Sequence, residues 1–395
     1  MSEASRLAYI SFDAVPAPKG AAIHIAAFTQ ALARHFGAVE LVTVAGALTP
    51  EPRTERWPGV FHTQLPGLGT SLIDRVLCFR ACLERWLSGR RFDLIQFRSI
   101  FEGIPLLGLQ PRPRLIFEVN GLPSIELPYR YPRAADDRDL MRKLRAQERT
   151  CLDAADRIVT PSSVTERYLV SHRGVESAKI RVIPNGVDTE LFRPGDPIGH
   201  GCGLLYFGTL AQWQGIDLAI RAVAQIRAFS PARLTILGAG GNRQREPIAA
   251  LAGKLGIGAH VEIAPPVEQE ELVRALHRSF AVLAPLAIND RNVLQGCCPL
   301  KVLEGMAAGI PVIASDLPAV RELGEHGRHL LLVKPGSVEQ IAQAVLQLRE
   351  DPALWQRLAT GGREHVLARY TWERSGAALA QVVAQALSGT PLGGA

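Results

Sequence analysis

The stretch GCCPLKVLEGMAAGIPVIAS, residues 296–315, predicts a helix followed directly by a buried strand. Pro299 suits the first turn of a helix, and Gly309 suits its end. The apolar, β-branched run at 312–314 then favours a strand enclosed on both faces. A helix that leads straight into such a strand is typical of an α/β fold with a parallel sheet.

Lys301 and Glu304 lie one helical turn apart in this stretch, on nearly the same face of the expected helix. The start of the helix offers free N–H groups and a positive dipole to a phosphate, and Lys301 adds a fixed cation. Glu304 can accept two hydroxyl hydrogen bonds, as a ribose would offer. An exposed Lys–Glu pair on a surface helix is the alternative interpretation of the same pattern.

The alternation of strand and helix extends through the rest of the chain. Apart from 312–314, strands are expected at 7–12, 39–44, 93–97, 115–119, 157–160, 180–183, 204–207, 233–237, 261–263 and 281–284. Helical stretches lie between them, among them 21–35, 72–87 and 140–153. This order predicts doubly wound parallel sheets of the Rossmann-like type.

The alternation is interrupted once, after the turn signal Pro184-Asn185-Gly186. Since a domain holds roughly 150 residues, 395 residues suggest two domains. We expect a first domain over 1–190, a linker over 191–202 and a second domain over 203–371. The segment 372–395 is expected to be a terminal helix and tail that braces the second domain or crosses back to the first.

Composition excludes several classes of protein. Hydrophobic residues make up 47% and charged residues 21%, as in ordinary globular proteins. The six cysteines are scattered and form no disulfide framework or zinc pattern, which favours a reducing cytoplasm. The sequence shows no secretory signal, apolar span, P-loop, metal motif or nucleic-acid-binding motif. Arginines are dense between Arg75 and Arg114, which favours an anionic partner or a solvated basic face.

Two loops of the first domain follow expected strands and are candidates for ligand contact, because ligands of open α/β sheets bind beyond the carboxyl ends of strands. Gly20 lets the backbone approach a ligand closely, just before a helix N-terminus. Only one glycine is present, so the loop is no G-x-G-x-x-G fingerprint. Glu118 and Asn120 project on the same side of an extended strand and predict an acceptor-side edge, with a simple Asx turn as the alternative.

Corresponding loops of the second domain carry glycines at strand ends. Gly208 and Thr209 follow the first strand of this domain, with Gln214 a few residues later, and Gly238 closes the next strand. Backbone amides at such positions can meet a ligand.

An apolar stripe runs along the expected helix 72–87. Its members are Leu72, Val76, Phe79, Leu83, Trp86 and Leu87, flanked by Arg75, Arg80 and Arg85. The stripe suits peripheral contact with a membrane and a lipid-linked acceptor, or ordinary packing against the sheet.

Together these stretches resemble the retaining family 4 of GT-B glycosyltransferases. Residues 157–163 (RIVTPSS) look like the strand and turn that end the first domain of that family. Residues 182–188 (VIPNGVD), followed by Phe192, are similar to its interdomain signature, and 303–315 to its donor-site helix and next strand.

The resemblance implies a GT-B fold and a hexosyl transfer from a nucleoside diphosphate sugar to an acceptor, in glycoconjugate synthesis, without metal or cofactor. It places Glu304 on the ribose, and the diphosphate at Gly20 and at the helix start, Pro299 and Leu300. Gly208, Thr209, Gln214 and Gly238 complete the donor side. From the residues themselves we expect Lys301 to stabilise the departing diphosphate, and Asn120 to stand at the acceptor side with Glu118.

The sequence departs from the family pattern at several of these positions. Gly296 stands where the first Glu of an E-x7-E motif is usual, and Thr209 and Gln214 stand where Arg and Lys are common. Lys301 can restore one phosphate cation, and Arg291 can supply another donor contact. Two alternatives stay open: a nucleotide-sugar 2-epimerase-like enzyme, and a subunit that binds nucleotide sugar without catalysis.

Overall fold

The computed structural model describes residues 5–46, 52–131, 136–195, 203–390 and 392, and its chain divides into two compact units. The first unit contains Ala21–Pro184 and the residues from Glu373 onward, together with the segment that precedes Pro18. The second contains Asn185–Trp372 and Pro18–Gly20. Most of the linker expected at 191–202 lies outside the described residues.

Within the described residues, the first unit is built on an eight-stranded sheet with the order β3-β4-β2-β1-β5-β6-β7-β8. Its strands are β1 (Leu7–Ser11), β2 (Val39–Val44), β3 (Thr54–Trp57), β4 (Val60–Leu65), β5 (Leu94–Phe97), β6 (Arg114–Glu118), β7 (Arg157–Thr160) and β8 (Ile180–Val182). All neighbours pair in parallel except β3 and β4, which form an antiparallel edge. Every residue of β1 and β5 is buried, as expected for central strands covered on both faces.

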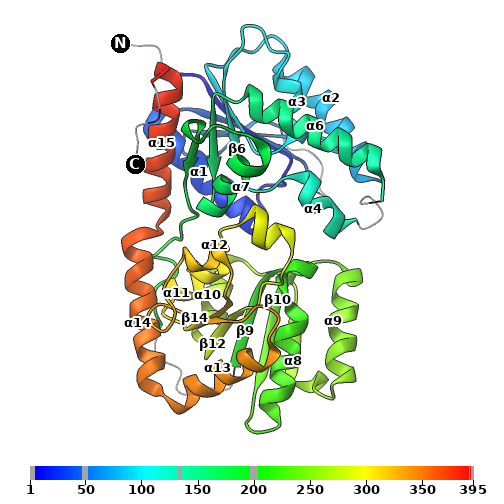
Figure 1. Cartoon of the computed structure of the whole chain (residues 1–395). Coiled ribbons are helices and arrows are strands. Elements are labelled where there is room, and N and C mark those ends of the chain that lie inside the picture. Colours follow the sequence, from blue (N-terminus) through cyan, green and yellow to red (C-terminus); the bar gives the residue numbers. More distant parts are fainter. Residues whose placement is uncertain (1–4, 47–51, 132–135, 196–202, 391, 393–395) are drawn as a thin grey trace. The chain divides into compact units, whose positions relative to one another are not determined.

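The helices of this unit are α1 (Gly20–Phe36), α2 (Leu72–Leu87), α3 (Ile100–Leu106), α4 (Pro123–Arg130), α6 (Arg138–Ala154), α7 (Ser163–Arg173) and α15 (Trp372–Ser388), with the short η1 (Ser177–Lys179). Several start at side chains that satisfy free backbone N–H groups. Ser71 with Asp74 caps α2, and Ser99 with Glu102 caps α3. Figure 1 shows the course of the chain through these elements.

The apolar stripe of α2 packs inside the first unit. Val76, Phe79, Leu83 and Leu87 are buried. Leu72 and Trp86 are partly buried against the same core. The packing interpretation is therefore the correct one, because four of the six members are buried and the other two are partly buried against the same core. Among the residues that the structure describes, no helix combines the length and apolarity that crossing a bilayer requires.

Arginines of the dense region between Arg75 and Arg114 serve contacts within the unit. Arg80 donates to the carbonyl oxygens of Ile100 and Phe101 at 2.7 and 2.9 Å. Arg112 and Arg114 each pair with Asp156, at 3.3 and 3.1 Å. These side chains stabilise the fold, which accounts for part of the basic excess without an external partner.

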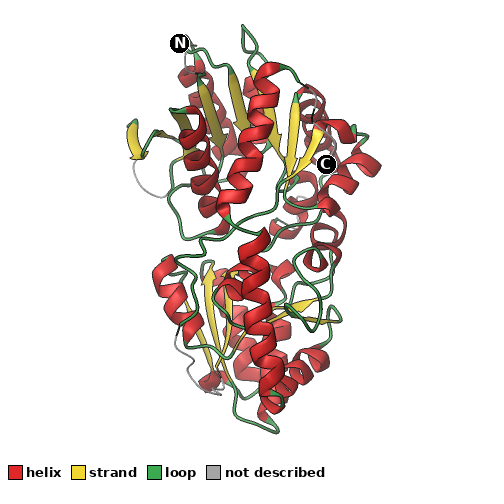
Figure 2. Ribbon diagram, turned by 90° about the vertical axis from the view of Figure 1, so that its left-hand side faces the viewer, coloured by secondary structure: helices red, strands yellow, loops and turns green. Residues whose placement is uncertain are grey.

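The second unit holds, in its described part, a six-stranded parallel sheet with the order β11-β10-β9-β12-β13-β14. Its strands are β9 (Gly203–Thr209), β10 (Arg233–Ala239), β11 (Val261–Ala264), β12 (Ala281–Ala284), β13 (Val312–Ser315) and β14 (Leu331–Val333). Its helical elements are η2 (Gln212–Gln214), α8 (Ile216–Arg227), α9 (Asn242–Lys254), η3 (Gly258–His260), α10 (Gln269–His277), η4 (Arg291–Gln295), α11 (Leu300–Ala307), α12 (Pro318–Arg321), α13 (Val338–Glu350) and α14 (Pro352–Arg369). In each unit the strands lie between layers of helices, as Figure 2 shows.

The structure confirms the two parallel α/β sheets that the sequence predicts and differs in detail. The hairpin β3–β4 and the short strand β14 were not expected. The segment after Leu122 begins with helix α4, which Pro123 opens at its first position.

Candidate functional site

Helix α11 carries both residues of the Lys301–Glu304 pair into the interior of the second unit. Pro299 caps the helix in an extended conformation, Leu300 is its first residue, and Gly309 beyond its end has a φ of +70°. Lys301 is 6% exposed and Glu304 is 4% exposed. The alternative of an exposed surface pair is therefore wrong.

The Lys301 ammonium has a defined position at the carboxyl edge of this sheet. Its Nζ donates to Gln214 Oε1 at 2.6 Å and lies 4.0 Å from the centroid of the Tyr206 ring. Tyr206 is fixed in turn, because its hydroxyl donates to the Thr209 carbonyl oxygen at 2.6 Å. Gly208, with a φ of +129°, lies close by: a Cβ atom there would be 3.5 Å from Lys301 Nζ. The structure thus brings together Lys301, Gln214, Gly208 and Thr209.

Burial strongly shifts both titratable groups of α11. The pKa of Lys301 is lowered to about 7, mainly by burial. The charge of Arg291 also lowers this pKa, while Cys297 and Glu304 raise it. Burial likewise raises the pKa of Glu304 to about 7, against the opposing charge of Lys301. Within the described part of the chain, the Glu304 carboxylate has no hydrogen-bond partner. A buried carboxylate is costly until something donates to it, so this one suits a ligand with hydroxyl groups.

The turn that presents Gln214 is held from two sides. The Asn292 side chain donates to the Trp213 carbonyl oxygen at 2.8 Å, and the Arg291 guanidinium lies 5.1 Å from the centroid of the Trp213 ring. Gly215 follows with a φ of +66°, and a Cβ atom there would come within 1.9 Å of the Pro285 carbonyl oxygen. Only glycine fits at this position, so the place of Gln214 is set by the backbone.

Two donor-side candidates remain, Gly238 and Gly20. Gly238 lies at the same sheet edge as Gly208, whereas Gly20 belongs to helix α1. Gly238 pairs with Gly208 across β10 and β9, at the same edge of the sheet. A Cβ atom at Gly238 would lie 2.1 Å from Leu210 Cδ2, so its glycine is needed for packing against that side chain. Gly20 is the first residue of α1, where the helix leaves free N–H groups.

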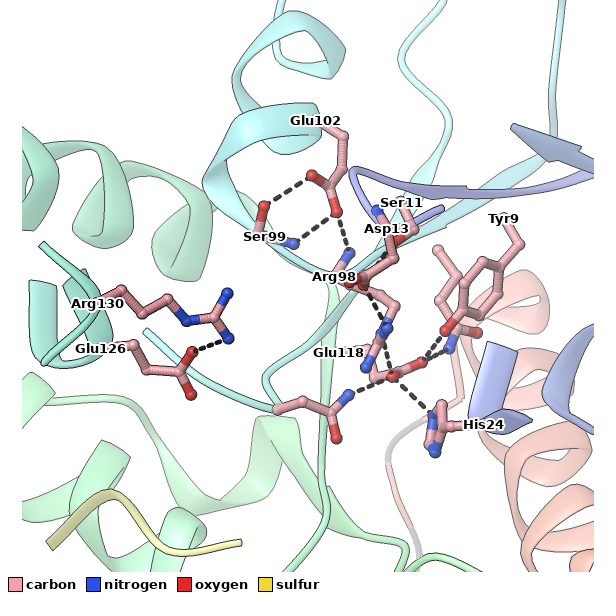
Figure 3. Close-up of polar contacts among 12 residues, drawn as sticks. Tyr9, Ser11, Asp13, His24, Arg98, Ser99, Glu102, Glu118, Glu126 and Arg130 are labelled. Atoms are coloured by element: carbon pink, nitrogen blue, oxygen red, sulfur yellow. Dashed lines mark hydrogen bonds and ion pairs between the residues drawn. The ribbon is translucent and has the colours of Figure 1, made fainter. Parts of the chain in front are cut away.

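A second polar cluster lies in the first unit, around Glu118 at the end of β6 (Figure 3). Both oxygens of this carboxylate are occupied. Oε2 accepts from the Tyr9 hydroxyl and from Gln96 Nε2, each at 2.6 Å, while Oε1 is contacted by Arg98 Nε at 2.9 Å, His24 Nε2 at 2.8 Å and Asn120 Nδ2. Glu118 is 1% exposed. A side chain so enclosed is suited to position its neighbours.

The charged groups of this cluster stabilise the ionised forms of one another. Burial alone would raise the pKa of Glu118, but His24 and Arg98 together lower it below its ordinary value. Burial would lower the pKa of Arg98, yet the groups around it, with Glu118 and Asp13 among them, raise it above its ordinary range. The ion pair between Glu118 and Arg98 is therefore charged at neutral pH.

Arg98 connects Glu118 to a more open carboxylate. Its Nη1 donates to Asp13 Oδ2 at 2.7 Å, and the Ser11 hydroxyl donates to the same oxygen at 3.0 Å. Asp13 follows β1, Arg98 follows β5 and Asn120 follows β6, and these three strands are parallel neighbours. The cluster therefore lies at the carboxyl edge of the sheet, where open α/β sheets bind ligands.

The buried side chain of Glu102 holds the backbone that carries Arg98. Glu102 accepts from the backbone N–H groups of Arg98 and Ser99 at 3.0 and 2.8 Å, and from the Ser99 hydroxyl at 2.7 Å. Burial raises its pKa to about 7. The Glu126–Arg130 pair of α4, 3.5 Å apart, is drawn beside the cluster in Figure 3.

The sequence pointed to only part of this cluster. Glu118 and Asn120, expected on the same side of an extended strand, contact each other, and His24 takes part in the cluster as well. Tyr9, Asp13, Gln96 and Arg98 were not predicted. A polar Gln96 inside the otherwise apolar strand LIQF is a signal that could have indicated a buried polar partner. No group of three or more His, Cys, Asp or Glu side chains suited to a metal ion occurs in the described ranges.

Comparisons with known proteins identify relatives of both units. Residues 18–191 match the family described as Glycosyltransferase Family 4, and residues 201–351 match Glycosyl transferases group 1. A D-inositol 3-phosphate glycosyltransferase from Acidothermus cellulolyticus is 33% identical over 240 residues, 56% of this chain and 51% of that protein. One from Catenulispora acidiphila is 27% identical over 78% of this chain and 72% of that protein. The alignments with several such relatives span about half of the relatives' length.

Solved structures share the fold. Sucrose-phosphate synthase from Thermosynechococcus elongatus superposes with a TM-score of 0.82 at 20% identity, covering 98% of this chain and 100% of that one. Anabaena Alr3699/HepE in complex with UDP-glucose superposes with a TM-score of 0.74 at 15% identity, covering 96% and 100% of the two chains. The expected GT-B architecture of two parallel-sheet domains is thereby confirmed.

Proposed function

Because the chain belongs to the group 1, family 4 glycosyltransferases, we propose that it transfers a sugar from a nucleoside diphosphate sugar to an acceptor hydroxyl group. One observation carries the proposal. Lys301 and Glu304 are both buried one turn apart on α11, and the Lys301 ammonium lies beside Gly208 and Gln214 at the carboxyl edge of the sheet. A cation for the diphosphate and a carboxylate for the ribose thus come from one helix.

The transfer breaks the bond between the anomeric carbon and the diphosphate oxygen, and negative charge grows on the departing group. A positioned cation in a site that excludes water stabilises such charge most effectively. Lys301 supplies that cation from the protein itself, which supports our proposal of a metal-independent reaction. The family resemblance supports retention of configuration and hexosyl transfer.

On the acceptor side, we propose that Asn120 meets the acceptor and that Glu118 acts through it as a positioning residue. The support is the burial of Glu118 and its contact with the Asn120 amide. The buried, unbridged thiols of Cys151 and Cys298 support action in a reducing compartment such as the cytoplasm. The HepE complex with UDP-glucose makes UDP-glucose the first donor to test, and the GDP-mannose in the name of a Mycobacterium tuberculosis relative makes GDP-mannose the second.

Substituting Glu304→Gln is expected to weaken binding of the donor roughly 10- to 150-fold, because a hydrogen bond to a charged group contributes about 1.5–3 kcal/mol. The measurement is release of nucleoside diphosphate from a panel of UDP- and GDP-sugars, with the KM for the donor as the readout. Glu364→Gln, at an exposed position on α14, is the matched control. If the wild-type protein neither binds nor turns over any donor, the proposed function is wrong.

The affinity for UDP is expected to be greatest near pH 7 and to fall on both sides. Lys301, whose pKa is lowered to about 7, must be protonated to hold a diphosphate, so affinity falls as pH rises above that value. Glu304, whose pKa is raised to about 7, must be ionised to accept ribose hydroxyls, so affinity falls as pH drops below it. In calorimetric titrations, the affinity for UDP should change by up to about tenfold per pH unit on the acid and on the alkaline side of the optimum. In Glu304→Gln the acid limb should vanish while the alkaline limb remains; a flat wild-type profile would contradict the assignment.

A further inference from the structure

The first unit exposes one carboxylate oxygen at the edge formed by the ends of β1, β5 and β6. The Asp13 side chain is 45% exposed, whereas those of Arg98 and Glu118 are 9% and 2% exposed. Asp13 Oδ2 is engaged by Arg98 and Ser11, while Oδ1 has no hydrogen-bond partner within the described residues. Asp13 is thus held in place by one oxygen and presents the other.

Asn120 presents a second open oxygen at the same edge. Its Nδ2 donates to Glu118 Oε1, which fixes the orientation of the amide because a carboxylate accepts only from the NH₂ group. Asn120 Oδ1 consequently points away from Glu118 and has no partner in the described part of the chain. The two open positions at this edge are therefore both acceptors.

The donors at this edge are directed inward instead. Arg98 points Nε at Glu118 and Nη1 at Asp13, and His24 Nε2 faces Glu118. Two carboxylates, Asp13 and Glu118, share the one guanidinium of Arg98. A ligand at this edge thus meets a fixed negative group and open acceptors, which favours hydroxyl donors and repels anions.

We infer that Asp13 and Asn120 bind the sugar acceptor through its hydroxyl groups, and that the acceptor carries a neutral sugar or polyol at this position in place of a phosphate. The inference rests on the proposed glycosyl transfer and names the chemistry of its second substrate. Asp13 accepts one hydroxyl at Oδ1 and Asn120 accepts a neighbouring one, while Glu118 and Arg98 fix both side chains and touch no substrate.

The test compares neutral acceptors with their phosphorylated forms in the full-length protein. With a UDP-sugar that the protein hydrolyses, glucose and myo-inositol are set against their monophosphates, and the acceptor-stimulated release of UDP is measured. Neutral members should be preferred at least about tenfold, the effect expected of one repelled charge. Asp13→Asn should raise the KM for the neutral acceptor about 10-fold or more relative to the KM for the donor.

Two further variants make the result independent of folding defects. Ser11→Ala loosens Asp13 while keeping its pair with Arg98, and should raise the acceptor KM by a smaller factor in a folded protein. Asp139→Asn removes an exposed aspartate that also pairs with an arginine, Arg142, and should change nothing. The inference is overturned if monophosphates are the better acceptors, if no neutral acceptor accelerates release, or if Asp13→Asn leaves the acceptor KM unchanged. A wild-type protein that releases no nucleoside diphosphate from any UDP- or GDP-sugar overturns the proposed function itself.

Discussion

Replacing Lys301 with methionine is expected to lower kcat for sugar transfer by roughly 100- to 1000-fold, the effect of removing one preorganised group that stabilises developing negative charge. Methionine keeps an apolar side chain of similar length and removes only the ammonium, which lies 4.0 Å from the centroid of the Tyr206 ring and contacts Gln214 at 2.6 Å. Because the same ammonium also meets the diphosphate in the ground state, UDP affinity should fall as well. Steady-state kinetics and calorimetry separate the two effects.

The matched control is Lys254→Met, at an exposed lysine on α9 of the same unit, which should leave both constants unchanged. Gln214→Leu adds a second arm: it removes the partner of the ammonium but keeps the charge, so kcat should fall far less than in Lys301→Met. Equal kcat values for wild type and Lys301→Met would remove Lys301 from catalysis while leaving Glu304 to be judged by its own variant.

Replacing Glu118 with glutamine is expected to lower the free energy of unfolding of the first unit by about 3–5 kcal/mol, the usual consequence of removing one partner of a buried ion pair. The substitution preserves volume but replaces one acceptor oxygen with an NH₂ group that faces other donors. Tyr9, Gln96, Arg98, His24 and Asn120 all direct donors or ring nitrogens at this carboxylate. Arg98 would be left with Asp13 as its remaining charged partner.

Denaturant unfolding followed by circular dichroism measures this change. Glu84→Gln, at an exposed position on α2, serves as the control and should shift the free energy of unfolding by no more than about 0.5 kcal/mol. Should Glu118→Gln unfold like the control, the cluster would not be the electrostatic centre that its geometry indicates.

Regular, well-buried elements could be predicted from the sequence because their pattern is local. The strands at β2, β7 and β12 were expected at the bounds that the structure shows, since each is a short apolar run between turn signals. The hairpin β3–β4 lies at the edge of its sheet, and its outer strand TERW is largely exposed, so it lacks the apolar signal of an inner strand. Strand β14 has only three residues, Leu331–Val333, too few for a periodicity.

The two polar clusters also differ in how far they could be predicted from the sequence. Lys301 and Glu304 belong to one helix, so helical spacing alone brings them together. The cluster around Glu118 draws on four separate segments, which the parallel register of β1, β5 and β6 brings to one edge. No pattern within any one segment shows that Asp13 and Arg98 will meet. Such a site follows from sheet topology, which the sequence implies only once the strand order is known.

The hydrogen bond between Lys301 and Gln214 also constrains how this protein can change over time. The positive charge at the turn after β9 comes from Lys301 on α11. The turn itself contributes the neutral amide of Gln214, which accepts the hydrogen bond from Lys301. A lysine at position 214 would face the ammonium of Lys301, so the two cations would repel each other. A substitution at either position alone would therefore be unfavourable. Related proteins should carry both residues or have both replaced together.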